Sequence, residues 1–210
     1  MIRDRLAELS ARPATDLPLE RLGLELAPAA VLLLVWEHAG DGQLLLTRRA
    51  RSLATQPGDI ALPGGRCEPG EEAVDTARRE AHEEVGLDPD AYIVMGRFDE
   101  AWSSAGSRVV PVVGWAGQPP RLQAAPDEVD EILVLPLVAL ADDANRSERV
   151  TPVARHEYRD SLITVGDTVV VGFTADLVLD LVVWLEGRDR HRVDERVADL
   201  AHFAADRGWR

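Results

Sequence analysis

The sequence predicts an α/β protein whose mixed sheet is flanked by helices. Two hairpin-like patterns, one near the start and one in the last third, indicate antiparallel strands. Helical patterns are interspersed among the strands without the strict alternation that produces a purely parallel sheet. A chain of 210 residues is long enough for one sizeable core, so we expect a single domain over 1–210 with its core at about 29–185.

The first third of the chain predicts a helix and then a hairpin. Residues 1–12 lack the apolar run of a signal peptide and have the spacing of an amphipathic helix. Strands are expected over 29–36 and 44–49, with Gly and Asp at the turn between them. Proline–glycine pairs then bracket a short extended segment over 59–62.

A helix is expected between Pro69-Gly70 and Gly86. Acidic residues in its first turn favour the helix dipole, and Gly86 provides a stop. At about 100° per residue, alanines and valines share one face. That face is expected to pack closely on the core.

Strands and two more helices make up the rest of the predicted fold. The expected strands are 92–98, 108–115, one from after Glu128 to Leu135, and a second hairpin of 150–159 and 162–171 that turns at Asp160-Ser161. The expected helices are one from an N-cap at Thr174 to Glu186 and a terminal amphipathic helix over 191–207.

Composition limits the classes of partner. The net charge is −14, and every basic residue is Arg, so nucleic acid backbones are repelled and lysine chemistry is excluded. No apolar stretch is long enough to span a membrane. A single cysteine, Cys67, argues against a disulfide framework. We therefore expect a cytoplasmic protein that acts on a small molecule and binds neither nucleic acid nor membrane.

The segment GGRCEPGEEAVDTARREAHEEVGL, Gly64 to Leu87, concentrates acidic residues beside a glycine-rich loop. Glu80 and Glu84 lie four apart on the predicted helix, and Glu83 lies slightly further round. Such like charges destabilise a helix unless something compensates them. A divalent cation bound through oxygens would do so. The alternative is a solvated helix end whose acids pair with neighbouring arginines.

The full spacing of this segment resembles the Nudix box at every defined position. The matching positions are Gly65, Glu71, Arg79, Glu80, Ala81, Glu83, Glu84, Gly86 and Leu87. The resemblance implies a Nudix hydrolase: an α/β/α sandwich with the box as a loop–helix–loop. It also implies Mg²⁺- or Mn²⁺-dependent cleavage of a nucleoside diphosphate linked to another moiety.

The resemblance also implies roles for individual residues. Metal ligands would be Glu80, Glu83, Glu84 and the carbonyl of Gly65, while Glu71 and Arg79 would form an orienting ion pair. A carboxylate must accept the proton of the attacking water, and Glu83 is the first candidate. In this family the base can instead come from a distal segment, which leaves open Glu128, Glu131, Glu148 and Glu157.

Upstream of the box, LLTRRARSLATQPGDIALPGG (Leu45–Gly65) resembles the motif of coenzyme A pyrophosphatases in this family. The implied products are 4′-phosphopantetheine and adenosine 3′,5′-bisphosphate. Two positions depart from the motif. Ala54 replaces an Arg, which removes a phosphate or pantetheine contact, and Leu62 replaces a Phe.

An acidic enzyme needs local positive charge to receive an anionic substrate. Arg49 and Arg51 lie just before the box, and Arg108 lies downstream. Neighbouring strand residues point to opposite faces, so only one of Arg48 and Arg49 faces the site, and Arg49 is the one that matches the motif. We expect Arg49, Arg51 and Arg108 to bind substrate.

Two other functions remain open. Ala54 favours a Nudix pyrophosphatase of different or broad specificity, acting on ADP-ribose, NADH or nucleoside diphosphate derivatives. A catalytically silent nucleotide-binding regulator is the other, although the box carboxylates that such proteins usually lose are all present. The terminal helices lie outside the resemblance and leave a homodimer open.

Overall fold

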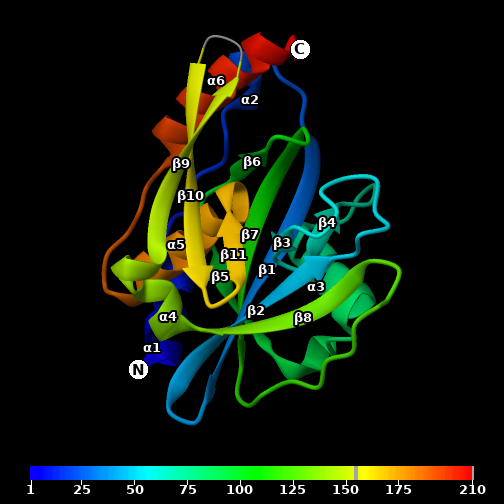
Figure 1. Ribbon diagram of the computed structural model, residues 1–210, viewed down its shortest axis with the longest axis vertical. Coiled ribbons are helices and arrows are strands. Elements are labelled where there is room, and N and C mark those ends of the chain that lie inside the picture. Colours follow the sequence, from blue (N-terminus) through cyan, green and yellow to red (C-terminus); the bar gives the residue numbers. More distant parts are fainter. Residues whose placement is uncertain (154–155, 210) are drawn as a thin grey trace.

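The computed structural model describes residues 1–153 and 156–209 and contains two sheets with helices packed around them (Figure 1). The strands are β1 (Ala27–His38), β2 (Asp41–Arg49), β3 (Ile60–Ala61), β4 (Gly64–Arg66), β5 (Ile93–Arg97), β6 (Ala101–Ser103), β7 (Ser107–Ala116), β8 (Val129–Pro136), β9 (Arg146–Val153), β10 (His156–Val165) and β11 (Thr168–Val171). The helices are α1 (Ile2–Ala7), α2 (Leu19–Leu22), α3 (Ala73–Val85), α4 (Leu137–Ala141), α5 (Gly172–Leu185) and α6 (Val193–Arg207). Short 3₁₀ turns are η1 (Glu8–Ala11), η2 (Pro89–Ala91) and η3 (Asp143–Asn145).

The larger sheet is mixed, as predicted. Its path runs β3-β2-β1-β7-β5, with β4 paired to β1, β6 to β7 and β8 to β2. Strands β1 and β7 are parallel, whereas β1 and β2 form the predicted antiparallel hairpin with Val35 opposite Leu44. A parallel pair within an antiparallel framework requires a long crossover, and the segment containing α3 is part of it.

Residues of β1 alternate between two cores, which places helices on both faces of the sheet. Leu32 and Leu34 pack with the alanines of α3, whereas Leu33 and Val35 pack with α1 and α5. Figure 1 shows α3 on one side of β1 and β7, with α1, α4 and α5 on the other. The predicted α/β/α arrangement is therefore confirmed.

The second sheet has the strand order β11-β10-β9, and one of its turns differs from the prediction. The expected turn at Asp160-Ser161 is wrong, because both residues lie within β10, where Asp160 is opposite Arg149. Thr151 Oγ and Arg149 donate to Asp160, so tertiary partners satisfy a side chain that usually favours turns. The chain instead turns at Gly166, which has a left-handed φ of 58°. The predicted strand 150–159 also includes 154–155, which lie outside the described residues.

The other helical predictions are confirmed with shifted ends. The helix predicted over residues 1–12 is present as α1 and η1, which together span 2–11, with Leu6 and Leu9 buried. Helix α5 begins two residues before Thr174, so Thr174 is a buried residue of the first turn rather than the N-cap. Helix α6 packs on the segment around Leu17 and Leu24. Within the described part of the chain, no helix is long and apolar enough to cross a membrane.

Candidate active site

Helix α3 is placed by its alanine face. Ala77, Ala81 and Val85 are fully buried against β1, as the spacing predicts. Gly86 ends the helix in a left-handed conformation at φ 61°, and its amide bonds to the last turn. Since one face is fixed on the sheet, the adjoining edge carries Glu80 and Glu84 toward strand β4.

Three carboxylates converge beside the glycine loop. Oxygens of Glu80, Glu84 and Glu128 lie within 4.8 Å of one another. The amide of Gly64 donates to Glu84 at 3.2 Å. A Cβ on Gly65 would lie 2.4 Å from a carboxylate oxygen of Glu80, so only glycine allows the backbone this close to the acids.

Burial and mutual repulsion make this cluster unfavourable without a counter-charge. Burial raises the pKa of Glu84 to about 8, and the charges of Glu80 and Glu128 add to the rise. Burial likewise raises the pKa of Glu80. Closely spaced carboxylate oxygens are the donor set that a hard divalent cation prefers. The residues present therefore fit the metal that the box implies.

Arg79 joins the glycine loop to the helix. Its guanidinium donates to Glu71 at 3.0 and 3.1 Å and to the carbonyl of Arg66 at 3.0 Å. It also contacts Glu80 and Glu83, each at 2.9 Å. Bonds from Arg79, the Glu68 amide and Thr76 lower the pKa of Glu71 to about 2. The predicted Glu71–Arg79 ion pair is therefore present in the structure.

Glu128, rather than Glu83, is the third member of the carboxylate group. Glu83 does not belong to the group of three, and its half-exposed side chain is held by Arg79. Glu128 arrives from a distant segment because Gln123 and Ala125 donate backbone bonds to the C-terminal end of α3. Among the distal acids left open for the base, Glu128 alone joins the group found within the described residues.

The other distal acids lie elsewhere. Glu131 pairs with Arg48 at 2.9 Å, and Glu148 faces Arg159 at 3.5 Å. Glu157 is an exposed residue of β10. Arg48 pairs with Glu131, whereas its neighbour Arg49 lines a cleft with the glycines of the loop, as the alternation predicts.

The three predicted substrate-binding arginines lie in different places. Arg49 lines a cleft of about 430 Å³ together with Gly64 and Gly65, which we call the glycine-loop cleft. Arg51 is an exposed residue 3.9 Å from Asp130. Arg108 lies 3.7 Å from buried Glu100 and lines a separate depression beside Glu71. The structure thus brings only Arg49 of the three to the glycine loop.

Sequence reasoning missed one supporting residue. Thr76 is fully buried on the apolar side of α3, and its hydroxyl donates to Glu71 at 2.8 Å. The sequence does contain a signal for this residue, because Thr76 lies among the alanines of the apolar face. A hydroxyl that is buried there needs a hydrogen-bond partner.

The chain is similar in sequence to several known proteins. A family model described as NUDIX domain matches residues 26–154. Nudix hydrolase 22 (chloroplastic) of Arabidopsis thaliana is 34% identical over 159 residues, which cover 72% of this chain and 53% of that protein. The uncharacterized Nudix hydrolase NudL of Pectobacterium atrosepticum is 33% identical over 165 residues, covering 76% and 83%.

A coenzyme A diphosphatase is also among the similar proteins. The mitochondrial coenzyme A diphosphatase NUDT8 of Homo sapiens is 36% identical over 130 residues, which cover 60% of this chain and 55% of that protein. The chain therefore spans about half the length of the plant and human relatives and most of the bacterial one.

Proposed function

Because this chain belongs to the Nudix hydrolase family, we propose that it hydrolyses the diphosphate bond of coenzyme A or its derivatives. The products would be 4′-phosphopantetheine and adenosine 3′,5′-bisphosphate, and the reaction would depend on Mg²⁺ or Mn²⁺. The observation that carries the proposal is the convergence of Glu80, Glu84 and Glu128 beside the glycine loop. The upstream motif supplies the substrate class.

The carboxylates of the box would hold the metal. Glu80 and Glu84 are the central ligands, and the carbonyl of Gly65 and Glu83 complete the set that the box implies. A bound divalent cation neutralises diphosphate oxygens and lowers the pKa of a coordinated water. Buried Glu84 fixes its carboxylate through the Gly64 amide, so this ligand is positioned before substrate arrives.

Glu128 is the residue we favour for removing the proton of the attacking water. Its carboxylate is exposed at the edge of the cluster, so it can exchange its proton with solvent. Glu83 is held by Arg79 and is better placed as a ligand than as a base. Glu128→Gln should lower kcat by about 10²–10⁴-fold while divalent metal still binds. The same loss in Glu83→Gln at unchanged metal affinity, with Glu128→Gln unaffected, would assign the base to Glu83.

Arg49 provides positive charge at the cleft. Its side chain lines this cleft with Gly64 and Gly65, and it donates to the carbonyl of Thr55 at 3.5 Å. Its charge lowers the pKa of Glu84, against the larger rise that burial causes. A guanidinium in this position can bind the phosphate that faces away from the acids. Arg51 and Arg108 stay candidates for later contacts with the substrate.

A substrate panel tests the proposal. Coenzyme A, acetyl-coenzyme A, ADP-ribose, NADH and dinucleoside polyphosphates would be incubated with enzyme and Mg²⁺ or Mn²⁺, and the products identified by mass. Preferential release of 4′-phosphopantetheine from coenzyme A is the expected result. Faster turnover of ADP-ribose or a dinucleotide would reject coenzyme A as the preferred substrate.

One observation favours a broader specificity as the second candidate. Ala54 is an exposed residue of the loop where the coenzyme A motif has Arg, so this chain lacks that contact. Ala54→Arg should then lower KM for coenzyme A and leave KM for ADP-ribose unchanged. An equal change for both substrates would indicate a general charge effect.

A further inference from the structure

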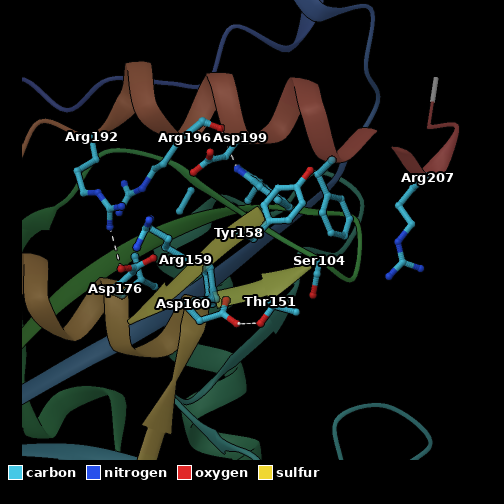
Figure 2. Close-up of a pocket in the computed structure, with 15 residues that line it drawn as sticks. Ser104, Thr151, Tyr158, Arg159, Asp160, Asp176, Arg192, Arg196, Asp199 and Arg207 are labelled. Carbon is cyan, nitrogen blue, oxygen red and sulfur yellow. Dashed lines mark hydrogen bonds and ion pairs between the residues drawn. The ribbon is translucent and has the colours of Figure 1, made fainter. Parts of the chain in front are cut away.

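A second cavity lies between the β9–β11 sheet and the C-terminal helix. It has a volume of about 310 Å³, and α5, α6, β9 and β10 provide most of its walls (Figure 2). We call it the C-terminal pocket. The family match ends at residue 154, so the residues from β10, α5 and α6 lie outside the matched segment. Ala101, Trp102, Ser104 and Thr151 provide the part of the lining that lies within the matched segment.

The C-terminal pocket adjoins the glycine-loop cleft. Ser104, Asp160 and Phe173 line both cavities. The cleft is also lined by Gly64 and Gly65, which contact the carboxylate cluster. A substrate whose diphosphate lies at these glycines can therefore extend past Phe173 into the C-terminal pocket.

Most carboxylates of the pocket already have basic partners. Asp176 binds Arg192 at 2.8 Å, and Asp160 binds Arg149 at 3.0 Å. Figure 2 shows the Arg192–Asp176 contact at one end of the pocket. Asp199, an exposed acid on α6, is the carboxylate of the lining for which the described residues provide no ion pair within 4.0 Å.

Two arginines of the lining remain available for an anion. Arg159 is 67% exposed at its side chain, and its contact with Glu148 is a long 3.5 Å. Arg207 lies over the ring of Phe203 at 5.3 Å, and no carboxylate among the described residues lies within 4.0 Å of it. Both residues line the pocket, and their guanidiniums can donate to a phosphate.

Aromatic side chains form the inner part of the pocket. Phe203 of α6 packs against Trp102 at 5.0 Å and against Tyr158 at 5.5 Å between ring centroids. The hydroxyl of Tyr158 is buried and has no hydrogen-bond partner among the described residues, and it belongs to the lining. A buried hydroxyl without a partner is costly unless a ligand or water satisfies it.

From this combination we infer that the C-terminal pocket binds the nucleotide end of the substrate, an aromatic base with its ribose phosphate. Flat aromatic faces suit a base, the Tyr158 hydroxyl and Asp199 suit its polar edge, and Arg159 and Arg207 suit the phosphate. A neutral pantetheine arm would use neither arginine. This inference rests on the proposed function only for the identity of the nucleotide.

Binding of the isolated nucleotide half tests the pocket without catalysis. Adenosine 3′,5′-bisphosphate would be titrated calorimetrically into the full chain in metal-free buffer. Arg159→Gln and Arg207→Gln should each weaken binding by about tenfold, because each removes a charge-assisted hydrogen bond. Tyr158→Phe, which removes only the hydroxyl, should weaken binding by a smaller factor.

Arg188→Gln is the matched control. Arg188 has a similarly exposed side chain, at 66%, and lies outside the pocket lining, so its loss makes the same change in net charge. Its affinity should equal that of the original chain. Equal weakening in Arg188→Gln and Arg159→Gln would overturn the inference, since it would reflect net charge alone.

Kinetics separate this inference from the proposed function. With coenzyme A, Arg159→Gln should raise KM and leave kcat unchanged, and it should reduce the preference over dephospho-coenzyme A. If the original chain hydrolyses coenzyme A but KM does not change in the variants, the pocket inference fails and the function stands. If coenzyme A is not hydrolysed but the bisphosphate binds with the expected losses, the function fails and the pocket stands.

Discussion

Individual residues show why a cation would stabilise the candidate site. Glu84 is 6% exposed, yet its nearest acidic neighbours are Glu80 and Glu128. Taking a carboxylate out of water among like charges raises its pKa, and the Gly64 amide compensates only in part. Without a metal, Glu84 therefore destabilises the folded state at pH values above the pKa that this carboxyl has in the unfolded chain.

The first prediction follows from the raised pKa of Glu84. In metal-free protein the folded state keeps this proton up to about pH 8, so stability is highest below the unfolded pKa and falls as pH rises through that range. Glu84→Gln should therefore be more stable than the original chain at pH 8 in EDTA. The difference in Tm should vanish near pH 4.

The Tm increase on adding Mg²⁺ and the rate of turnover test the same variant for metal binding. Glu84→Gln should lose most of the Tm increase that Mg²⁺ gives the original chain, and turnover should fall by at least about 10²-fold. Glu37→Gln, at an exposed position of β1, is the matched control and should behave like the original chain. Full activity in Glu84→Gln would mean that the metal site lies elsewhere.

The second prediction concerns the closest backbone approach in the site. Gly65→Ala places a methyl group 2.4 Å from the Glu80 carboxylate, so one of them must move. Since the Glu80 side chain gives way more easily than the backbone, we expect a large loss of metal affinity with a small loss of stability. Gly117→Ala, where a Cβ meets nothing within 4 Å, is the control. Unchanged metal titration curves for Gly65→Ala would contradict this assignment of Glu80.

Among the elements, α3 shows how packing fixes catalytic geometry. Its inward face is made of small side chains, and Ala77 and Ala81 allow the helix to lie close on β1. Because the carboxylates are on the adjoining edge, the depth of packing decides how near they lie to the glycine loop. Arg79 then joins the helix to that loop through Glu71 and the carbonyl of Arg66.

The third prediction tests whether close packing of α3 on β1 positions the carboxylates. Ala81→Leu adds methylenes at a fully buried contact and should lower the free energy of unfolding by about 1–3 kcal/mol. It should also weaken metal binding, because α3 moves outward. Ala205→Leu, at an exposed position of α6, is the control and should change neither quantity. Denaturant titration and metal titration measure the two effects, and unchanged metal affinity in Ala81→Leu would separate packing from the site.

Element prediction succeeded where the signal was local. The hairpin of β1 and β2, the box helix and both terminal helices follow from periodicity, glycine and proline, which act through neighbouring residues. The turn at Asp160-Ser161 was wrong because partners from β9 and α5 bind those side chains. Short strands such as β4 and β6 carry too few residues to show a period of their own.

At the scale of the whole molecule, buried ion pairs connect the two ends of the chain. Arg12 donates to Asp99 at 3.0 and 2.9 Å and to Asp189 at 2.9 and 3.0 Å, and its side chain is only 3% exposed. Burial raises the pKa of Asp99, but the bonds from Arg12 and the Thr15 amide outweigh it, so the net shift is downward. We propose that these contacts make residues 1–210 one cooperative domain.

The fourth prediction removes this connection. Arg12→Ala leaves Asp99 buried without its partner and should lower the free energy of unfolding by about 3–5 kcal/mol. Because the folded pKa of Asp99 is depressed, its contribution is present above the unfolded value and is lost as pH falls through the folded one. The deficit of Arg12→Ala should therefore shrink toward low pH, and a constant deficit would contradict the ion pair.

A double variant controls for the size of the arginine side chain. Arg12→Ala with Asp99→Asn should recover part of the lost stability, since the buried charge at position 99 is removed and only the more exposed Asp189 keeps a carboxylate without Arg12. The original chain should unfold in a single transition by circular dichroism. Separate transitions for the core and for the terminal segments would reject the single domain.

The sequence alone determined the family resemblance, the mixed sheet between helices and the two central carboxylates. These depend on spacing along one helix, and Glu80 and Glu84 lie on one edge wherever α3 packs. Only the tertiary structure decided that Glu128 joins them, that Glu83 is held by Arg79, and that Arg49 rather than Arg108 reaches the cleft. The C-terminal pocket likewise required the fold. Contacts between distant segments are set by packing and hydrogen bonds that no local pattern records.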